Sequence, residues 1–385
     1  MVHRPQDHHN RIIILLLGFL SFSVVLHIIT LEWFHLADPP LSHFHIHKNE
    51  DSVAPYRSED GKHILRSYED ILKAAGVEIT GEIRSSLPPL SDLEEMYGSE
   101  PVIIGLEKCS EFRSKYGPKE AVIAPAGMFN TGTNLLNALL QNNCVISEET
   151  RNKKYIFGGK NPFIRYQVPW GKHQPVSWRL QHVAPTFEGA NQEAFLPGLV
   201  IKDPYTWMDS MCRHKYAANW AHFEGHCPNL VPINEVERVA VKQRGGDGST
   251  VTVNVHYHDD PNKITKHSSM VDLWNTYYGD WLKTDFPKVV IRFEDLLVHA
   301  ETVVEKVCTC AGGTLKPGPF KYEQESAKEK QGLKVHAGSN GFVQSIIKYG
   351  LMSNRVNMYT SQDLDFAKSE LDKDLMKMFR YTEPS

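Results

Sequence analysis

The sequence lacks the signatures of several common kinds of site. No Cys-x-x-Cys occurs among its six cysteines and no His-Glu-x-x-His among its 19 histidines. These absences argue against a zinc ribbon, a thioredoxin-type redox site and a metalloprotease. The formal net charge of -4 also lacks the basic excess that nucleic-acid binding requires. We therefore expect no metal cofactor and no nucleic-acid partner.

The six cysteines permit up to three disulfides if the chain folds in an oxidising compartment. Cys212 and Cys227 enclose a polar and aromatic segment, and a bridge between them would stabilise it by restricting the unfolded chain. Cys308 and Cys310 lie two residues apart in a predicted helix, where their side chains point away from each other. We expect these two to be free, buried thiols.

One hydrophobic run is long enough to cross a membrane. Residues 12–31 contain no Asp, Glu, Lys or Arg, and a helix of that length spans roughly 30 Å, the thickness of a bilayer core. Arg4 and Arg11 precede the run and acidic residues follow it, which predicts a cytosolic N-terminus and a lumenal remainder. A cleaved signal peptide is the competing interpretation, but its apolar core would be shorter, about 7–15 residues.

These features divide the chain into a cytosolic tail (1–11), a transmembrane signal anchor (12–31), a stem and connecting region (32–119) and a globular domain (120–385). Helices are predicted in the stem at residues 67–75 and 91–97. Ser91 is the expected N-cap of the second helix, with Glu94 completing a capping box.

A phosphate-binding loop is predicted near residue 130. AVIAPAG (121–127) predicts a buried strand, MFNTGTN (128–134) a turn, and LLNALLQNN (135–143) a helix. This order directs backbone N–H groups and a helix N-terminus at a phosphate. Gly127 and Gly132 have the spacing of a Walker A loop, but Thr133 stands where that loop has its lysine, which disfavours a kinase or an ATPase.

A second strand, turn and helix follow at residues 195–215. Lys202 ends the predicted strand, Asp203-Pro204 form the turn, and Ser210 lies eight residues after Lys202. A cation at the strand end and a hydroxyl in the following helix can bind one terminal phosphate. An ordinary strand-loop-helix with a charged turn would show the same pattern.

Taken together, these blocks resemble the sulfotransferases that use 3′-phosphoadenosine 5′-phosphosulfate. That family carries Lys or Arg and then Ser-Gly-Thr in its 5′-phosphosulfate loop. Here Thr131, Gly132 and Thr133 match, but Asn130 replaces the basic residue. The family's 3′-phosphate motif, a strand-end Arg and a Ser eight residues later, is matched by Lys202 and Ser210. Similarity in VVIRFEDLL (289–297) and in the closing segment 363–381 extends the resemblance over residues 121–381.

The resemblance implies an α/β fold with a central, mainly parallel sheet of the P-loop type, flanked by helices and preceded by the anchor and stem. It implies that residues 120–385 transfer a sulfuryl group from 3′-phosphoadenosine 5′-phosphosulfate to a hydroxyl or amine without a metal. Lumenal placement favours a carbohydrate or glycoconjugate acceptor and a type II protein of the Golgi membrane. The implied donor-binding residues are Phe129, Asn130, Thr131, Gly132, Thr133, Asn134, Lys202 and Ser210.

The predicted catalytic residues are His173, Lys172 and Asn130. Lys172-His173-Gln174-Pro175 resembles the family's Lys-Thr-His-x-Pro segment without its Thr, which makes His173 the candidate general base. The alternative is a histidine in a surface loop. Lys172 is expected to supply the positive charge that Asn130 lacks, and Lys160 is a second candidate for that role.

Two rival functions stay open. A lumenal glycosyltransferase would have the same anchor and stem but would need a metal-binding Asp-x-Asp, which occurs only at 363–365 and 372–374, in predicted helices. A donor-binding pseudoenzyme is the other rival, and Asn130 is its main support. Residues 229–268 predict a β-hairpin around Gly-Gly-Asp-Gly, and Trp274, Tyr277 and Tyr278 predict core contacts on a helix.

Overall fold

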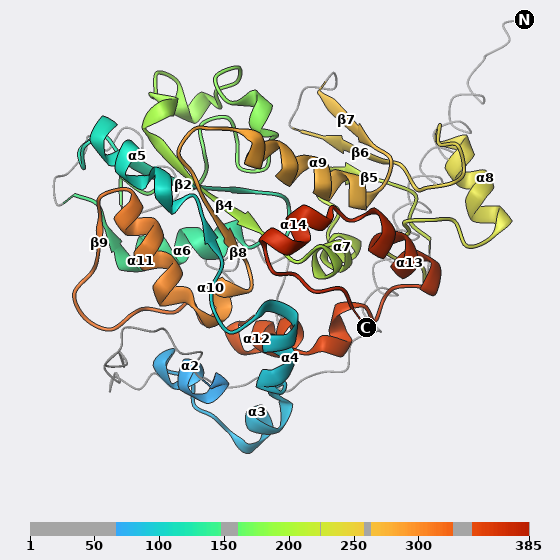
Figure 1. The fold of residues 1–385 in the computed structure, drawn as a ribbon, viewed down its shortest axis with the longest axis horizontal. Coiled ribbons are helices and arrows are strands. Elements are labelled where there is room, and N and C mark those ends of the chain that lie inside the picture. Colours follow the sequence, from blue (N-terminus) through green and yellow to red (C-terminus); the bar gives the residue numbers. More distant parts are fainter. Residues whose placement is uncertain (1–66, 148–160, 224, 258–262, 326–340, 385) are drawn as a thin grey trace, which may run out of the picture. The chain divides into compact units, whose positions relative to one another are not determined.

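The protein has an α/β fold built on a mainly parallel sheet. The computed structural model describes residues 67–147, 161–223, 225–257, 263–325 and 341–384, all in one compact unit (Figure 1). The central sheet has the order β1-β8-β4-β2, with β1 at Ile103–Ile104, β2 at Val122–Gly127, β4 at Phe195–Ile201 and β8 at Val289–Arg292. Strands β2, β4 and β8 are parallel, and β1 pairs antiparallel with β8. This confirms the coarser part of the predicted fold class, an α/β arrangement with a mainly parallel sheet, for the described residues.

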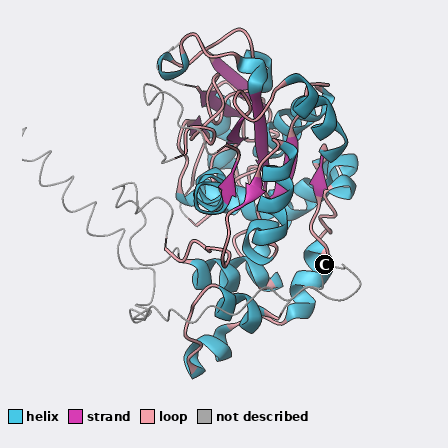
Figure 2. Cartoon of the chain, turned by 90° about the vertical axis from the view of Figure 1, so that its left-hand side faces the viewer, coloured by secondary structure: helices cyan, strands magenta, loops and turns pink. Residues whose placement is uncertain are grey.

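Helices flank the sheet (Figure 2). All residues of β2, β4 and β8 are buried, as expected for parallel strands covered on both faces. Helix α6 (Thr133–Asn143) packs closely on β4, since a Cβ at Gly198 would lie 2.9 Å from Leu136 Cδ2. Helix α9 (Met270–Lys283) also contacts β4, because the Tyr278 hydroxyl donates to the Val200 carbonyl at 3.0 Å.

The aromatic residues of α9 have the core role predicted from their spacing. Trp274, Tyr277 and Tyr278 are all buried. The Trp274 indole donates to the carbonyl oxygen of Lys202 at 3.1 Å, which helps to fix the end of β4. The helix therefore positions the turn that follows β4 rather than presenting an aromatic surface.

The remaining elements surround this core. The other helices are α2 (Tyr68–Ala74), α3 (Gly81–Ser86), α4 (Leu90–Tyr97), α5 (Cys109–Lys115), α7 (Pro204–Arg213), α8 (Glu235–Gln243), α10 (Asp295–Val298), α11 (Ala300–Cys310), α12 (Phe342–Gly350), α13 (Ser361–Glu370) and α14 (Lys373–Met378). Strands β3 (Cys144–Val145) and β9 (Thr314–Leu315) form an antiparallel pair, while β5 (Ala218–Asn219), β6 (Val253–His256) and β7 (Ile264–His267) form a small antiparallel sheet.

The two helices predicted in the stem are present, but one of their caps differs from the prediction. Ser67 caps α2 by accepting from the Asp70 amide at 3.2 Å. Helix α4 begins one residue earlier than expected, and its N-cap is Pro89, which has no side-chain oxygen to offer. The predicted cap at Ser91 is therefore wrong, because Ser91 lies inside the first turn.

The hairpin predicted in residues 229–268 is also wrong in its first half. Its first arm is helix α8, which begins after Asn234, whose side chain accepts from the Glu237 amide at 2.9 Å. The segment EVERVAVKQ fits both a period of two and a helical period, and the cap decides between them. Its second arm is strand β6, which pairs with β5 and β7 instead.

Three disulfides link the described cysteines, and two of them overturn a prediction. The expected Cys212–Cys227 bridge is present. Cys308 and Cys310 diverge on α11 as predicted, but neither is a free thiol. Cys308 pairs with Cys144 at the end of α6, and Cys310 pairs with Cys109 at the start of α5. Because their side chains point in different directions, α11 is bound to two separate segments.

The predicted tail and anchor (1–31), the stem as far as residue 66, and Lys160 lie outside the described residues. None of the helices in residues 67–147, 161–223, 225–257, 263–325 and 341–384 is long and apolar enough to cross a membrane. The same residues contain no group of three or more His, Cys, Asp and Glu side chains suited to a metal ion.

Candidate functional site: two loops at the ends of adjacent parallel strands

The two predicted phosphate loops lie side by side. Strands β2 and β4 are parallel neighbours, so the segments that follow them leave the same edge of the sheet. Both bends at the first loop require glycine. At Gly127 (φ 147°) a Cβ would lie 2.6 Å from the Val200 carbonyl oxygen, and at Gly132 (φ 84°) it would lie 2.4 Å from the Phe293 ring. These close approaches hold the first loop against the end of β4 and against the Phe293 ring.

Asn130 ties the first loop to the second unit. Its backbone is left-handed, with φ 61°, a conformation that asparagine tolerates better than most residues. Its amide nitrogen donates to the carbonyl oxygens of Ser210 at 3.2 Å and His214 at 2.8 Å, at the end of α7. The Trp207 indole adds a bond to the carbonyl oxygen of Phe129 at 2.9 Å. The neutral side chain at position 130 therefore has a clear positioning role between the two loops.

Lys202 and Ser210 are in direct contact, as their spacing predicts. The Lys202 ammonium donates to the Ser210 hydroxyl oxygen at 2.9 Å, and the two residues are only 1% and 5% exposed. Asp203 caps α7 by accepting from the amides of Tyr205 at 2.9 Å and Thr206 at 3.1 Å. This cap fixes the angle between strand and helix that brings the cation and the hydroxyl together.

Three residues that the sequence analysis did not select complete this cluster. A guanidinium nitrogen of Arg213 lies 3.2 Å from the Ser210 hydroxyl oxygen, and the Lys202 ammonium lies 3.9 Å above the Tyr349 ring. Burial raises the pKa of Tyr349, but Lys202, Lys348 and Arg213 outweigh it and hold that pKa at about 8. Burial, with Arg213 and Lys202 nearby, also lowers the pKa of Lys348.

The cluster therefore carries an excess of positive charge. Its one carboxylate partner in the described contacts is Asp209, which accepts from Arg213 at 2.5 Å. Arg213 could have been found from the sequence, because it lies one helical turn after Ser210. Lys348 and Tyr349 lie on α12, far along the chain, and no local pattern connects them to this site.

His173 lies against the end of β2. Its Nδ1 is 2.7 Å from the Gly127 carbonyl oxygen, and its ring centroid is 4.7 Å from that of Phe129. A carbonyl oxygen only accepts, so Nδ1 carries a proton in this contact and Nε2 is the basic nitrogen of the neutral ring. The Gly127 amide donates in turn to the Lys172 carbonyl oxygen at 3.0 Å. The predicted general base thus lies beside the first loop.

Lys172 reaches the start of α6. Its ammonium donates to the Asn134 side-chain oxygen at 2.6 Å and lies 3.0 Å above the Tyr166 ring. Thr131 folds back onto its own loop, with its hydroxyl donating to the Met128 carbonyl oxygen at 2.7 Å. The structure consequently places a buried cation next to the loop that contains the neutral Asn130.

Buried charges beneath the site hold the second turn. The Asp203 carboxylate accepts from Arg355 Nε at 2.8 Å, and Glu294 accepts from the Asp203 amide at 3.1 Å. Burial, followed by the Asp203 charge, raises the pKa of Glu294 to about 7. Arg292 and Asp295 bond to each other at 2.8 Å, both buried. Arg292, Glu294 and Asp295 are thus all enclosed by the fold.

Taken as a whole, the site combines a glycine-containing loop after β2 and a turn after β4 with two separate cationic groups. Lys202, Lys348 and Arg213 lie around Ser210, and Lys172 lies at the start of α6. Such an arrangement can bind a ligand with two phosphate-like groups. None of three comparisons, with protein-family models, curated proteins and solved structures, found a match to this chain.

Proposed function

We propose that the protein is a sulfotransferase that uses 3′-phosphoadenosine 5′-phosphosulfate. The main support is the buried contact of Lys202 with Ser210, beside a glycine-containing loop that leaves the neighbouring strand. Two anion sites on adjacent strand-helix units suit a nucleotide with phosphate groups at both its 3′ and 5′ positions. In this proposal Lys202, Ser210 and Arg213 bind the 3′-phosphate, and residues 129–134 bind the 5′-phosphosulfate.

The reaction needs only groups that lie at these loops. Nε2 of His173 takes the proton of the acceptor hydroxyl or amine while that acceptor atom bonds to sulfur. The bond between sulfur and the bridging oxygen of the 5′-phosphate breaks, and 3′-phosphoadenosine 5′-phosphate leaves. Lys172 stabilises the negative charge that develops on the departing phosphate. With the predicted lumenal placement, a carbohydrate or glycoconjugate is the proposed acceptor and the Golgi membrane the proposed location.

One observation favours a second candidate, a protein that binds the donor without transferring sulfate. Asn130 supplies no charge, and its amide is bound to the end of α7. If the cation near the bridging oxygen is essential and Lys172 does not replace it, the donor is bound but transfer is slow. This candidate differs from the first only in turnover.

The glycosyltransferase alternative is disfavoured by the places of its two Asp-x-Asp triplets. Asp363 is fully buried and accepts from the amides of Leu230 at 2.7 Å and Val231 at 3.2 Å. Asp372 caps α14 through bonds from the amides of Asp374 and Leu375. Both first carboxylates are thus occupied by the backbone, and neither is open to a metal and a nucleotide sugar.

Calorimetric titration of the full-length protein in detergent tests these functions. We expect 3′-phosphoadenosine 5′-phosphate to bind and UDP-sugars not to bind. Sulfuryl transfer is then measured with radiolabelled donor and a panel of glycan acceptors. Binding without transfer to any acceptor supports the pseudoenzyme, and the absence of nucleotide binding contradicts both.

Lys202→Ala should weaken binding of 3′-phosphoadenosine 5′-phosphate by about 1.5–3 kcal/mol, the range for a hydrogen bond to a charged group. Binding of adenosine 5′-phosphosulfate, which lacks the 3′-phosphate, should hardly change. Both affinities are measured by calorimetry on the same preparation, with Lys283→Ala, on an exposed part of α9, as the matched control. Equal losses for the two ligands would show that Lys202 does not contact the 3′-phosphate.

The lowered pKa of the Tyr349 phenol leads us to predict that donor binding depends on pH. Its pKa is about 8, so its phenol ionises as the pH rises through that value. A phenolate beside Lys202 repels a phosphate, so affinity for 3′-phosphoadenosine 5′-phosphate should fall between about pH 7 and about pH 9. In Tyr349→Phe, which cannot ionise, the affinity should fall less over that range, because only the lowered pKa of Lys348 then contributes. The same pH dependence in both proteins would exclude Tyr349 from the cause.

A further inference from the structure

A second pocket lies away from the donor loops, at the small antiparallel sheet. It has a volume of about 370 Å³ and is lined by Asn219, Trp220, Arg244, Thr252 and Asn254. Asn219 belongs to β5 and Asn254 to β6, Trp220 and Thr252 adjoin these two strands, and Arg244 follows α8. Figure 1 shows these elements on one side of the molecule. The volume is within the range of small-molecule sites.

The register of the sheet explains why amide groups gather there. Asn219 on β5 lies directly opposite Asn254 on β6, so both side chains lie on one face. Thr252 is two residues before Asn254 and belongs to the same face by strand alternation. A polar wall of two amides and one hydroxyl results.

Two buried polar atoms at this pocket have no partner in the described part of the chain. They are the Trp220 indole nitrogen, in a residue only 2% exposed, and the Asn254 side-chain oxygen. One is a donor and the other an acceptor. Buried polar groups in native proteins nearly always have a partner, so a pair of this kind at one pocket needs an explanation. Both atoms are enclosed by protein, so a ligand hydroxyl, which donates and accepts, reaches either one only when its side chain turns into the pocket.

The positive charge at the pocket indicates that its ligand carries an anionic group. Arg244 lines it, and the Lys215 ammonium lies 5.2 Å from the centre of the Trp220 ring. None of the described residues that line the pocket carries a carboxylate. A guanidinium binds carboxylate or sulfate groups through paired hydrogen bonds.

We infer that this pocket binds an acidic saccharide, a ligand that carries hydroxyls together with a carboxylate or sulfate group. Ligand hydroxyls bond to the side chains of Asn219 and Thr252, and the anionic group bonds to Arg244. The inference goes beyond the proposed reaction and does not depend on donor binding. In a sulfotransferase such a site would hold an acidic glycan chain outside the reacting unit.

Calorimetry on the full-length protein in detergent, with defined oligosaccharides, tests this site. The probes are a tetrasaccharide containing uronic acid, the same tetrasaccharide with sulfate groups, a neutral N-acetylglucosamine tetramer and inorganic sulfate. We expect the acidic tetrasaccharides to bind and the neutral tetramer and free sulfate to bind at least tenfold more weakly. The relative affinity of the two acidic probes shows whether carboxylate or sulfate is preferred.

Two conservative variants locate the binding. Arg244→Gln removes the exposed charge and should weaken binding roughly tenfold to a hundredfold. Asn254→Asp keeps the size of the side chain but repels the anion, and it should cause a similar loss. Arg238→Gln is the matched control, an exposed arginine on α8 that bonds to Glu235 and does not line the pocket.

The outcomes separate this site from the donor site. Unchanged affinity in Arg244→Gln, an equal loss in Arg238→Gln, or equal binding of the neutral tetramer would overturn the inference. So would an absence of binding by the wild-type protein. Titration of the same preparations with 3′-phosphoadenosine 5′-phosphate shows whether the donor site is intact, so failure of one proposal is distinguishable from failure of the other.

Discussion

His173→Ala should reduce sulfuryl transfer by roughly 10²–10⁴ in turnover, the usual contribution of a general base. The Nδ1 contact with the Gly127 carbonyl oxygen at 2.7 Å leaves Nε2 as the basic nitrogen, and the ring lies beside the loop proposed to hold the sulfuryl group. Donor affinity should change little, because the ring acts on the acceptor. Turnover is measured with radiolabelled donor and the best acceptor of the panel.

A second substitution separates catalysis from positioning. His173→Asn retains an N–H group for the bond to Gly127 but offers no basic nitrogen, so it should lose as much turnover as His173→Ala. Recovery of activity in His173→Asn would mean that the residue only positions the loop. His256→Ala, an exposed histidine at the end of β6, is the control and should retain full activity. Full activity in His173→Ala would remove this residue from the mechanism.

The local parts of the site could be predicted from the sequence. A strand, a tight turn and a helix each leave a short-range pattern, and both predicted units have that order. The eight-residue spacing of Lys202 and Ser210 corresponds to a direct contact because Asp203 caps the intervening helix. Patterns of this kind involve residues close together in the sequence, so the local structure they predict is also found in the folded protein.

The long-range parts could not be predicted in the same way. Cys144 and Cys308 are 164 residues apart, and Cys109 and Cys310 are 201 apart, so only the tertiary fold shows that these thiols meet. The same applies to Lys348 and Tyr349, which reach Lys202 from α12. Packing, rather than any local pattern, brings these residues together.

The prediction of a strand at residues 235–243 was wrong for a different reason. The hydrophobic pattern of this segment fits a strand and a helix about equally well, and the Gly-Gly-Asp-Gly that follows is a strong turn signal. Glu237 contributes to the cap that decides the outcome, because its carboxylate is buried and accepts from the Ile233 amide at 2.9 Å. A buried carboxylate that meets backbone donors requires the helix to begin at a fixed residue.

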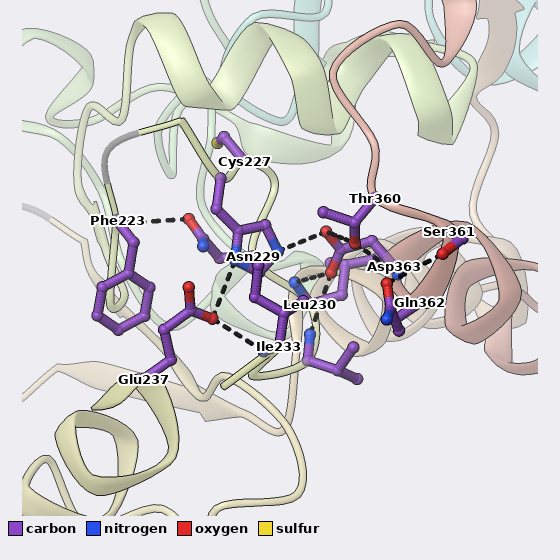
Figure 3. A network of polar contacts seen from close by, with 12 residues as sticks. Phe223, Cys227, Asn229, Leu230, Ile233, Glu237, Thr360, Ser361, Gln362 and Asp363 are labelled. Carbon is purple, nitrogen blue, oxygen red and sulfur yellow. Dashed lines mark hydrogen bonds and ion pairs between the residues drawn. The ribbon is translucent and has the colours of Figure 1, made fainter. Parts of the chain in front are cut away.

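The same carboxylate belongs to a buried network that links α8, the loop after the Cys212–Cys227 bridge, and α13. Figure 3 shows Glu237 and Asp363 on opposite sides of that loop. Nδ1 of His226 lies 3.0 Å from Glu237, and its Nε2 lies 2.7 Å from Asp363. An ionised carboxylate only accepts, so each ring nitrogen must donate unless one carboxyl group holds a proton. The imidazole therefore holds two buried acidic groups together.

His226→Ala should lower the free energy of unfolding by about 3–5 kcal/mol, the cost of leaving a buried charge without its partner. All three residues are nearly inaccessible in the wild-type protein, so bulk solvent does not screen the interaction of the imidazole with the two carboxylates. The change is measured by urea denaturation of the full-length protein in detergent with its disulfides intact. His267→Ala is the matched control, since this buried histidine bonds to the Thr265 hydroxyl at 3.0 Å and faces only one, partly exposed carboxylate, Asp272, so its loss should lower the free energy of unfolding less than His226→Ala does.

A double substitution shows whether charge is the cause. Adding Glu237→Gln to His226→Ala removes one of the two carboxylates and should recover more than about 1 kcal/mol, because coupled residues in one network do not behave additively. The new side-chain amide oxygen would still accept from the Ile233 amide, so the start of α8 is preserved. If the losses of unfolding free energy in His226→Ala and Glu237→Gln simply add, the imidazole stabilises the fold through packing alone. Its hydrogen bonds to Glu237 and Asp363 would then contribute little.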